Sequence, residues 1–221
     1  MHAKPGSRGF ASHTGTLGMV WMLNGMSVSE PEVIGYSWGR VNVPVIFVAG
    51  DDRLQGDLQS SMPGIEFVVT KLATSASTVQ LRSVDSVHAE MRAAARRAVQ
   101  NVDRVRPMKL ETPILAGLRA TPPASLTMLD SVPGLNYREN AVTFTAQNFG
   151  DAYRGINALI RVAVGGYQSV LSEVLASEAN APQLQLKFRE ALFARWQDYE
   201  SGRWTPPPPK PPTQKRYHGD N

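Results

Sequence analysis

The feature that most constrains the fold is a continuous apolar run at residues 43–52, Val-Pro-Val-Ile-Phe-Val-Ala-Gly-Asp-Asp. Such a run is typical of a parallel strand buried on both faces, whose carboxyl end opens into a loop. A second apolar run follows at residues 65–70, and a short helix is predicted between the two, over residues 53–60. Because strand, helix and strand in this order form a crossover unit, we predict an α/β fold with a mainly parallel or mixed sheet and flanking helices.

Hydrophobic periodicity indicates further elements on both sides of this unit. The predicted strands are residues 19–23, 113–119 and 141–146, and the predicted helices are residues 29–39, 86–105 and 151–164. Asn24 and Gly25 follow the first of these strands, and both tolerate positive φ, so they predict a hairpin turn.

The chain is predicted to have three segments. Residues 1–165 hold the α/β elements, and residues 166–203 form a helical extension that ends in a C-terminal helix. Residues 204–221 are a basic, Pro-rich tail. Since proline lacks the N–H that helices and sheets use, the tail is predicted to be extended or disordered.

Charge and composition exclude several classes of protein. The formal net charge is +4, and residues 202–221 contribute three of these charges, so the body is nearly neutral and does not indicate nucleic-acid binding. No apolar stretch is long enough to span a membrane, and no signal peptide opens the chain, so we expect a cytoplasmic protein with no membrane partner. The absence of cysteine excludes disulfides, thiolate zinc sites and a cysteine nucleophile.

Histidine and acidic residues are the remaining candidates for chemistry. His88 opens an amphipathic helix and His218 lies in the tail, so neither is predicted to be functional. His2 and His13 lie among small residues in loops, from which an imidazole can reach a metal or a substrate. Glu30 stands at a helix start, where it is either a dipole-stabilising acid or a metal ligand. Spacing alone does not link these three residues.

Asp51 and Asp52 are paired carboxylates at the end of a predicted strand. They are interpreted either as a solvated turn or as a position that binds a metal or accepts hydrogen bonds. No glycine-rich phosphate loop is present, and Ser12 and His13 lack the nucleophile elbow of a serine hydrolase.

Several motifs follow one another along the chain. They are His2-Ala3, Gly9, Ser12-His13, Asn24-Gly25, Glu30, the run at 43–52, Lys71, Val-Arg-Pro at 105–107, Pro133-Gly134, and Val-Thr-Phe-Thr-Ala-Gln-Asn-Phe-Gly-Asp-Ala-Tyr at 142–153. Their order resembles the second half of the D-aminopeptidase family of zinc metallopeptidases. The resemblance covers residues 1–164. Its most specific part is the spacing of the run at 43–52 from the Ser-His pair.

The resemblance implies a two-zinc aminopeptidase that hydrolyses short peptides with N-terminal D-amino acids. It also implies a ring-like homo-oligomer whose sites face an internal chamber. In this family pattern His2 and Glu30 match metal ligands, and His13 matches a catalytic histidine that does not bind metal. The resemblance therefore predicts that the three side chains lie at one site.

The family pattern also has an Asp-x-Glu pair and an Asp-Ser-His motif, which would lie upstream of Met1. Their absence predicts a chain truncated at its N-terminus, through a mis-called start, a split gene or a real loss, with weak zinc binding and little activity of its own. Asp51 and Asp52 are the first candidates for replacement ligands. One alternative is a non-catalytic assembly subunit whose Pro-rich tail recruits a partner. Another is a small-molecule binding domain at Gly50, Asp51 and Asp52.

Overall fold

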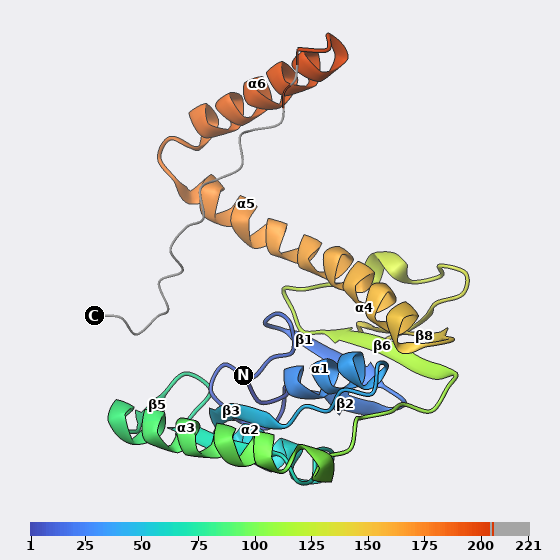
Figure 1. Cartoon of the computed structure of the whole chain (residues 1–221). Helices are drawn as coiled ribbons and strands as arrows, with labels where there is room; N and C mark the ends of the chain where they lie inside the picture. Colours follow the sequence, from blue (N-terminus) through green and yellow to red (C-terminus); the bar gives the residue numbers. More distant parts are fainter. Residues whose placement is uncertain (204, 206–221) are drawn as a thin grey trace. The chain divides into compact units, whose positions relative to one another are not determined.

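The computed structural model describes residues 1–203 and 205, and this part of the chain divides into two compact units, residues 1–170 and the described residues from 171 onward. The first unit contains two sheets with helices packed against them, which confirms the α/β class (Figure 1). The Pro-rich segment at 206–212 and His218 lie outside the described residues, so the predicted disorder of the tail stays a prediction.

The larger sheet is antiparallel throughout and has the strand order β2-β1-β6-β8-β7. Its strands are β1 (Met19–Leu23), β2 (Met26–Val28), β6 (Ile114–Ala120), β7 (Asn136–Arg138) and β8 (Ala141–Ala146). The hairpin between β1 and β2 forms at the predicted turn, where Asn24 and Gly25 have φ of 49° and 81°. Positive φ at both positions matches the right-handed twist of the two strands.

The smaller sheet contains the predicted crossover unit. It has the order β3-β4-β5, and its strands are β3 (Phe47–Asp51), β4 (Glu66–Ala73) and β5 (Val79–Leu81). β3 and β4 are parallel and are joined through helix α2 (Asp52–Leu58), whereas β4 and β5 are antiparallel. Of the two predicted alternatives the mixed sheet is therefore the right one, with parallel pairing only between β3 and β4 among the described strands.

Three longer helices of the first unit pack beside these sheets. They are α1 (Glu30–Gly39), α3 (Val84–Gln100) and α4 (Phe149–Ala163). The unit also contains three short 3₁₀ helices, η1 (Val102–Arg104), η2 (Thr127–Leu129) and η3 (Val164–Gly166). Helix α4 lies against β6 and β8, and α3 lies against β4 and β3 (Figure 1). The main core lies between α4, α1 and the large sheet, where Leu23, Leu118, Val142 and Ile156 are almost fully buried. Burial of these side chains from water is the main force that holds the unit together.

The second unit is helical, in agreement with the periodicity of its sequence. It contains the latter part of α5 (Tyr167–Ser177) and helix α6 (Ala181–Glu200).

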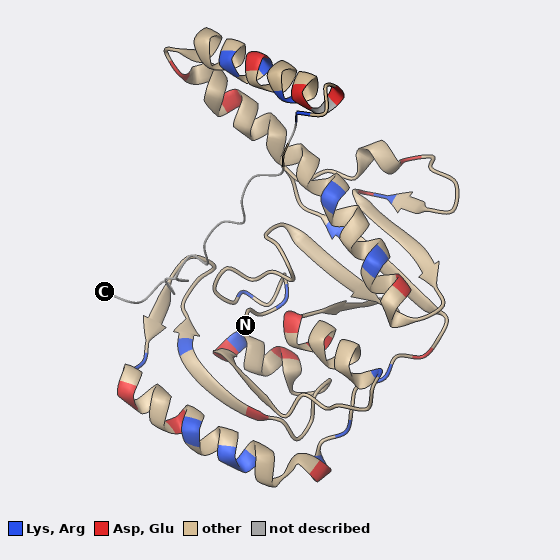
Figure 2. Cartoon of the chain, turned by 45° about the horizontal axis from the view of Figure 1, so that its top comes forward, with Lys and Arg blue, Asp and Glu red and all other residues tan. Residues whose placement is uncertain are grey.

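Acidic and basic side chains are mixed along α3 (Figure 2). Arg97 on this helix pairs with Glu66 on β4, with Nη2 2.8 Å from Oε2, and Glu90 pairs with Arg82. Arg97 and Glu90 of α3 therefore take part in surface ion pairs, and the pair of Arg97 with Glu66 connects the helix to the small sheet. No helix in the described part of the chain is both long and apolar enough to cross a membrane.

Candidate metal centre

Three side chains that are distant in sequence meet at one place. Nδ1 of His2 lies 3.7 Å from Oε2 of Glu30, and Nε2 of His13 lies 3.5 Å from Oε1 of Glu30. The two imidazole rings have centroids 4.3 Å apart. One potential ligand atom of each residue lies within 4.8 Å of those of the other two. The predicted approach of His2, His13 and Glu30 is thus found in the structure.

Glu30 is placed by the first turn of α1. Ser29 precedes the helix, and Oε2 of Glu32 accepts hydrogen bonds of 2.7 Å from both the backbone N–H and the hydroxyl of Ser29. Pro31 in the first turn has no N–H to leave unpaired. Glu32 is 5 % exposed, and its carboxylate is used by the hydrogen bonds to Ser29. The carboxylate of Glu30 instead faces the two histidines.

His13 is held by the backbone of its own loop. Its Nδ1 lies 2.6 Å from the carbonyl oxygen of Ala11. Because a carbonyl oxygen only accepts, Nδ1 carries a proton and donates it to this bond. The next residue, Thr14, is buried and donates its hydroxyl hydrogen to the carbonyl of Val28 at 2.7 Å. The loop therefore presents the other ring nitrogen of His13, Nε2, to Glu30.

Burial and the neighbouring His13 lower the pKa of His2. A lowered pKa means that the neutral imidazole dominates at neutral pH, and this is the form that binds metals. Lys71, on β4, also disfavours a protonated His2, and its Nζ lies 4.6 Å from the ring centroid of Phe10. This cation–π contact joins the small sheet to the loop that carries His13.

Asp51 is a positioning residue, and of the alternatives predicted for it the hydrogen-bonding position is the one found. It is 1 % exposed, and its two oxygens accept hydrogen bonds of 2.9 Å from the backbone N–H groups of Leu54 and Phe10. A Cβ atom on Gly9 would lie only 3.0 Å from Oδ2 of Asp51 and 2.7 Å from Cβ of Ala3. The absence of a side chain at Gly9 thus lets the loop approach the end of β3 closely.

Asp52 does not pair with Asp51. Its Oδ1 accepts a hydrogen bond of 2.7 Å from the backbone N–H of Ala73 at the end of β4, whereas Asp51 binds Phe10 and Leu54. Neither aspartate belongs to the group of potential metal ligands found among residues 1–203 and 205. The expectation that the two carboxylates act together as a strand-end site, or as replacement ligands, therefore has no geometric support.

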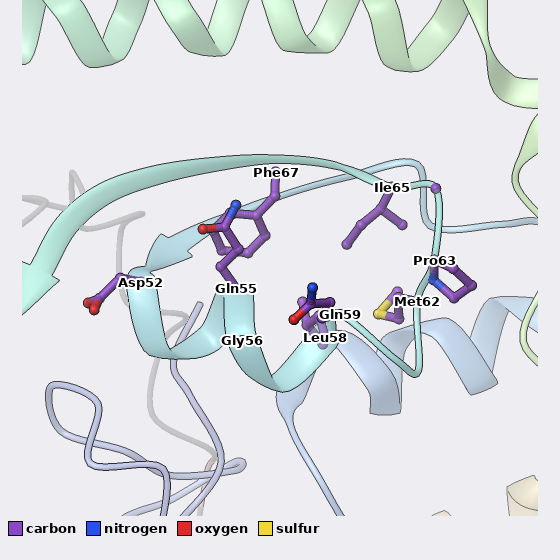
Figure 3. A pocket seen from close by; sticks show the side chains of 10 residues that line it. Asp52, Gln55, Gly56, Leu58, Gln59, Met62, Pro63, Ile65 and Phe67 are labelled. Atoms are coloured by element: carbon purple, nitrogen blue, oxygen red, sulfur yellow. The ribbon is translucent and has the colours of Figure 1, made fainter.

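The remaining candidates lie elsewhere. His88 is an exposed residue of α3, in agreement with a surface role. A cavity of about 530 Å³ lies between α2 and the start of β4, with Asp52, Gln55 and Gln59 among its lining residues (Figure 3). It shares no lining residue with the group formed by His2, His13 and Glu30.

The donor set of the three residues suits zinc. Imidazole nitrogen and carboxylate oxygen bind zinc at about 2.0–2.2 Å, so two ligands of one ion lie at most ~4.4 Å apart. The separations of 3.7 Å between His2 and Glu30 and of 3.5 Å between His13 and Glu30 meet this condition without rearrangement.

Comparison with known proteins decides the family. The family model described as D-aminopeptidase matches residues 1–158 of the chain. The chain belongs to the D-aminopeptidase family. All three residues of the candidate metal centre lie inside the matched range, whereas α5 and α6 lie outside it.

A curated protein and a solved structure are also similar to this chain. A D-aminopeptidase of Bacillus subtilis (strain 168) is 24 % identical over 166 residues, which are 74 % of this chain and 61 % of that protein. A solved structure, the Zn-dependent D-aminopeptidase DppA from Bacillus subtilis, described as a self-compartmentalizing protease, is similar in fold. Its TM-score is 0.69 at 24 % identity, with the same two coverages. The chain thus spans about three fifths of the length of these relatives.

Proposed function

We propose that this protein takes part in the zinc-dependent hydrolysis of short peptides, from which it releases an N-terminal D-amino acid. The observation that carries the proposal is the convergence of His2, His13 and Glu30 in a chain of the D-aminopeptidase family. The Bacillus subtilis relative is Zn-dependent, which agrees with the donor set of this group.

Each of the three residues has a role that its geometry permits. His2 and Glu30 would hold zinc, since the lowered pKa of His2 favours its neutral form and Glu30 supplies a carboxylate. When bound, zinc supplies Lewis-acid chemistry that polarises a carbonyl and acidifies water. Nδ1 of His13 donates to Ala11, which leaves Nε2 as the nitrogen that would accept the proton of the attacking water and then return a proton to the leaving amine nitrogen. The carbonyl of Ala11 keeps this ring in the required tautomer throughout.

A site for two zinc ions needs more protein ligands than these three residues supply. We propose that the further ligands come from the part of the family's chain that this sequence does not match. Under this proposal the 221-residue chain binds zinc weakly and hydrolyses aminoacyl substrates little above background. We also propose that the enzyme is cytoplasmic and forms a homo-oligomer, and the self-compartmentalizing character of DppA supports the homo-oligomer.

The chain's segments have different parts in this proposal. Residues 1–165 would form the metallopeptidase portion, residues 166–203 a helical extension, and residues 204–221 a separate tail. The end of the family match at residue 158 supports the first of these boundaries.

Zinc titration calorimetry of the chain tests the ligand assignment. Glu30→Gln is expected to weaken zinc binding by more than the roughly 10- to 100-fold that the loss of an outer-shell partner costs. His13→Gln is expected to retain most of the binding. The control His88→Gln changes a surface histidine of α3 and should bind zinc as the unaltered protein does.

Hydrolysis of D-alanyl and L-alanyl p-nitroanilide tests the activity. In-frame coding sequence upstream of codon 1 is added to the gene, and the products with and without it are compared. Faster hydrolysis of the D-substrate by the extended protein, abolished by His13→Gln, is the expected result. If Glu30→Gln leaves zinc binding unchanged, the metal site is refuted and a non-catalytic assembly subunit becomes the better interpretation.

A further inference from the structure

A mainly apolar cavity borders the candidate metal centre. Its volume is about 520 Å³, within the range of small-molecule sites, and Glu30 is one of its lining residues. The apolar lining includes Trp21 on β1, Val33 and Ile34 on α1, and Tyr153 and Ile160 on α4. The same glutamate therefore belongs both to the group of potential metal ligands and to the wall of this cavity.

The cavity is built from rigid elements of the fold. Trp21 is 4 % exposed and Val33 is 8 % exposed, so both are fixed by the main core. The ring centroids of Trp21 and Tyr153 are 5.7 Å apart, at an interplanar angle of 55°. Tyr153 and Ile160 are seven residues apart on α4, which places them on one face of that helix. Apolar walls on fixed elements favour an apolar occupant of defined size.

The buried indole of Trp21 lies in the wall of this cavity. Its Nε1–H has no hydrogen-bond partner among the described residues. A Cβ atom on Gly15, another lining residue, would lie 3.4 Å from this nitrogen, so the missing side chain at Gly15 leaves space beside it. An apolar occupant offers no hydrogen-bond acceptor, so this N–H is a probe of packing at the cavity wall and not a contact to the occupant.

We infer that this cavity binds the side chain of the substrate's first residue, and that the preferred side chains are large and apolar, such as those of phenylalanine and leucine. The inference rests on the proposed function, since an aminopeptidase holds the first residue's amine and carbonyl at its metal centre. The side chain is attached to the carbon between these two groups, so it must enter space that adjoins the metal centre. The cavity bordered by Glu30 provides such space.

Binding of the free amino acids tests this inference without a need for turnover, because they are products of the proposed reaction. The 221-residue protein is supplied with zinc, and the dissociation constants of D-phenylalanine, D-leucine and D-alanine are measured by calorimetry. These ligands have the same charged groups, so any difference comes from the side chain. D-phenylalanine and D-leucine are expected to bind at least about tenfold more tightly than D-alanine, since each buried methylene adds roughly 1 kcal/mol or more.

Variants of α1 locate the binding. Ile34→Trp fills the cavity and should remove the preference for D-phenylalanine, and Ile34→Ala, which conserves the fold more safely, should reduce it several-fold. Ser37→Trp is the matched control, because Ser37 is exposed on the same helix and does not line the cavity. The indole N–H resonance of Trp21, assigned with Trp21→Phe, should move on addition of D-phenylalanine but not in Ile34→Trp.

Equal or tighter binding of D-alanine, or a Trp21 resonance that D-phenylalanine does not move, would overturn the inference. These outcomes are distinct from a failure of the proposed function. If zinc binding is independent of His2 and Glu30, the proposed metal site fails whatever the amino-acid profile. If zinc binds through these residues but the three amino acids have equal dissociation constants, only the assignment of the cavity fails.

Discussion

The carboxylate of Asp51 at the end of β3 accepts a hydrogen bond of 2.9 Å from the backbone N–H of Phe10, 41 residues earlier in the chain. The other oxygen of Asp51 caps α2 through the N–H of Leu54. One buried side chain therefore ties the loop that carries His13 to the crossover unit of the small sheet. This explains how a segment with little regular structure holds a histidine in a fixed position.

We predict that Asp51→Ala lowers the free energy of unfolding by about 2 kcal/mol or more. The reason is that two backbone N–H groups lose their acceptor, and a buried unpaired donor costs roughly 1–3 kcal/mol. Urea denaturation followed by circular dichroism measures the change. Asp51→Asn keeps one oxygen acceptor and should cost less than Asp51→Ala.

Asp103→Ala serves as the control, because Asp103 is an exposed residue of η1. Its effect should stay within about 0.5 kcal/mol, as for most surface substitutions. Equal stability of Asp51→Ala and Asp103→Ala would show that Asp51 does not anchor the loop.

The strands and helices with strong periodicity could be predicted from the sequence, but the direction of strand pairing could not. The parallel pair of β3 and β4 follows from two apolar runs joined by a short helix. The central strands β6 and β8 have equally apolar sequences, yet they pair in antiparallel fashion. Local sequence encodes burial rather than direction, and the three-residue strands β5 and β7 are too short to show any period.

The candidate site was predicted by family resemblance and not by spacing. His2, His13 and Glu30 show no tight ligand motif, because loop closure and the start of α1 bring them together in three dimensions. A hydrogen-bonding role of Asp51 could be predicted, but its partner could not, since Phe10 is distant in sequence. The role of Glu32 could have been found, because Ser29 and Glu32 form the Ser-x-x-Glu signature of a capping box.

This cap leads to a prediction about Glu30. Glu32→Ala removes the acceptor for the N–H and hydroxyl of Ser29, so the first turn of α1 should fray and displace Glu30 from the histidines. We expect a loss of about 0.5–2 kcal/mol in the free energy of unfolding, together with weaker zinc binding. Glu32→Gln retains an oxygen acceptor and should recover part of both. Calorimetric zinc titration and urea denaturation of the two variants measure these effects.

Glu111→Ala is the control for Glu32→Ala, since it removes an exposed glutamate from a loop. A Glu32→Ala protein that binds zinc as tightly as Glu111→Ala would contradict the proposed link between the cap and the metal centre.

The buried phenol of Tyr36 predicts a loss of stability at alkaline pH. Burial, with a further contribution from Glu32, raises the pKa of Tyr36 above its usual value of about 10. The folded state therefore keeps the proton where the unfolded state has lost it. The stability that depends on the neutral phenol is complete below pH ~10 and declines as pH rises through the pKa of the folded state.

Tyr36→Phe has no phenol to titrate and should show a smaller decline between about pH 9 and pH 11.5. Urea denaturation at several pH values measures both proteins, and the difference between their pH profiles isolates Tyr36 from the other titrating groups. Parallel profiles across this range would refute the prediction.

Two helical glycines are predicted to respond in opposite ways to replacement by alanine. A Cβ atom on Gly39 in α1 would lie 1.9 Å from the carbonyl oxygen of Met108, a backbone atom that cannot move aside without displacing its segment. Gly39→Ala should therefore destabilise the protein by about 1–3 kcal/mol or more, the usual range for overpacking.

A Cβ atom on Gly56 in α2 would meet nothing within 4 Å. Gly56→Ala should stabilise the protein by about 0.5–1 kcal/mol, because alanine loses less backbone entropy in a helix. Thermal denaturation of both variants checks the signs. Stabilisation by Gly39→Ala would mean that α1 does not pack against residue 108 as closely as the structure shows, and the placement of Glu30 at the start of this helix would then need revision.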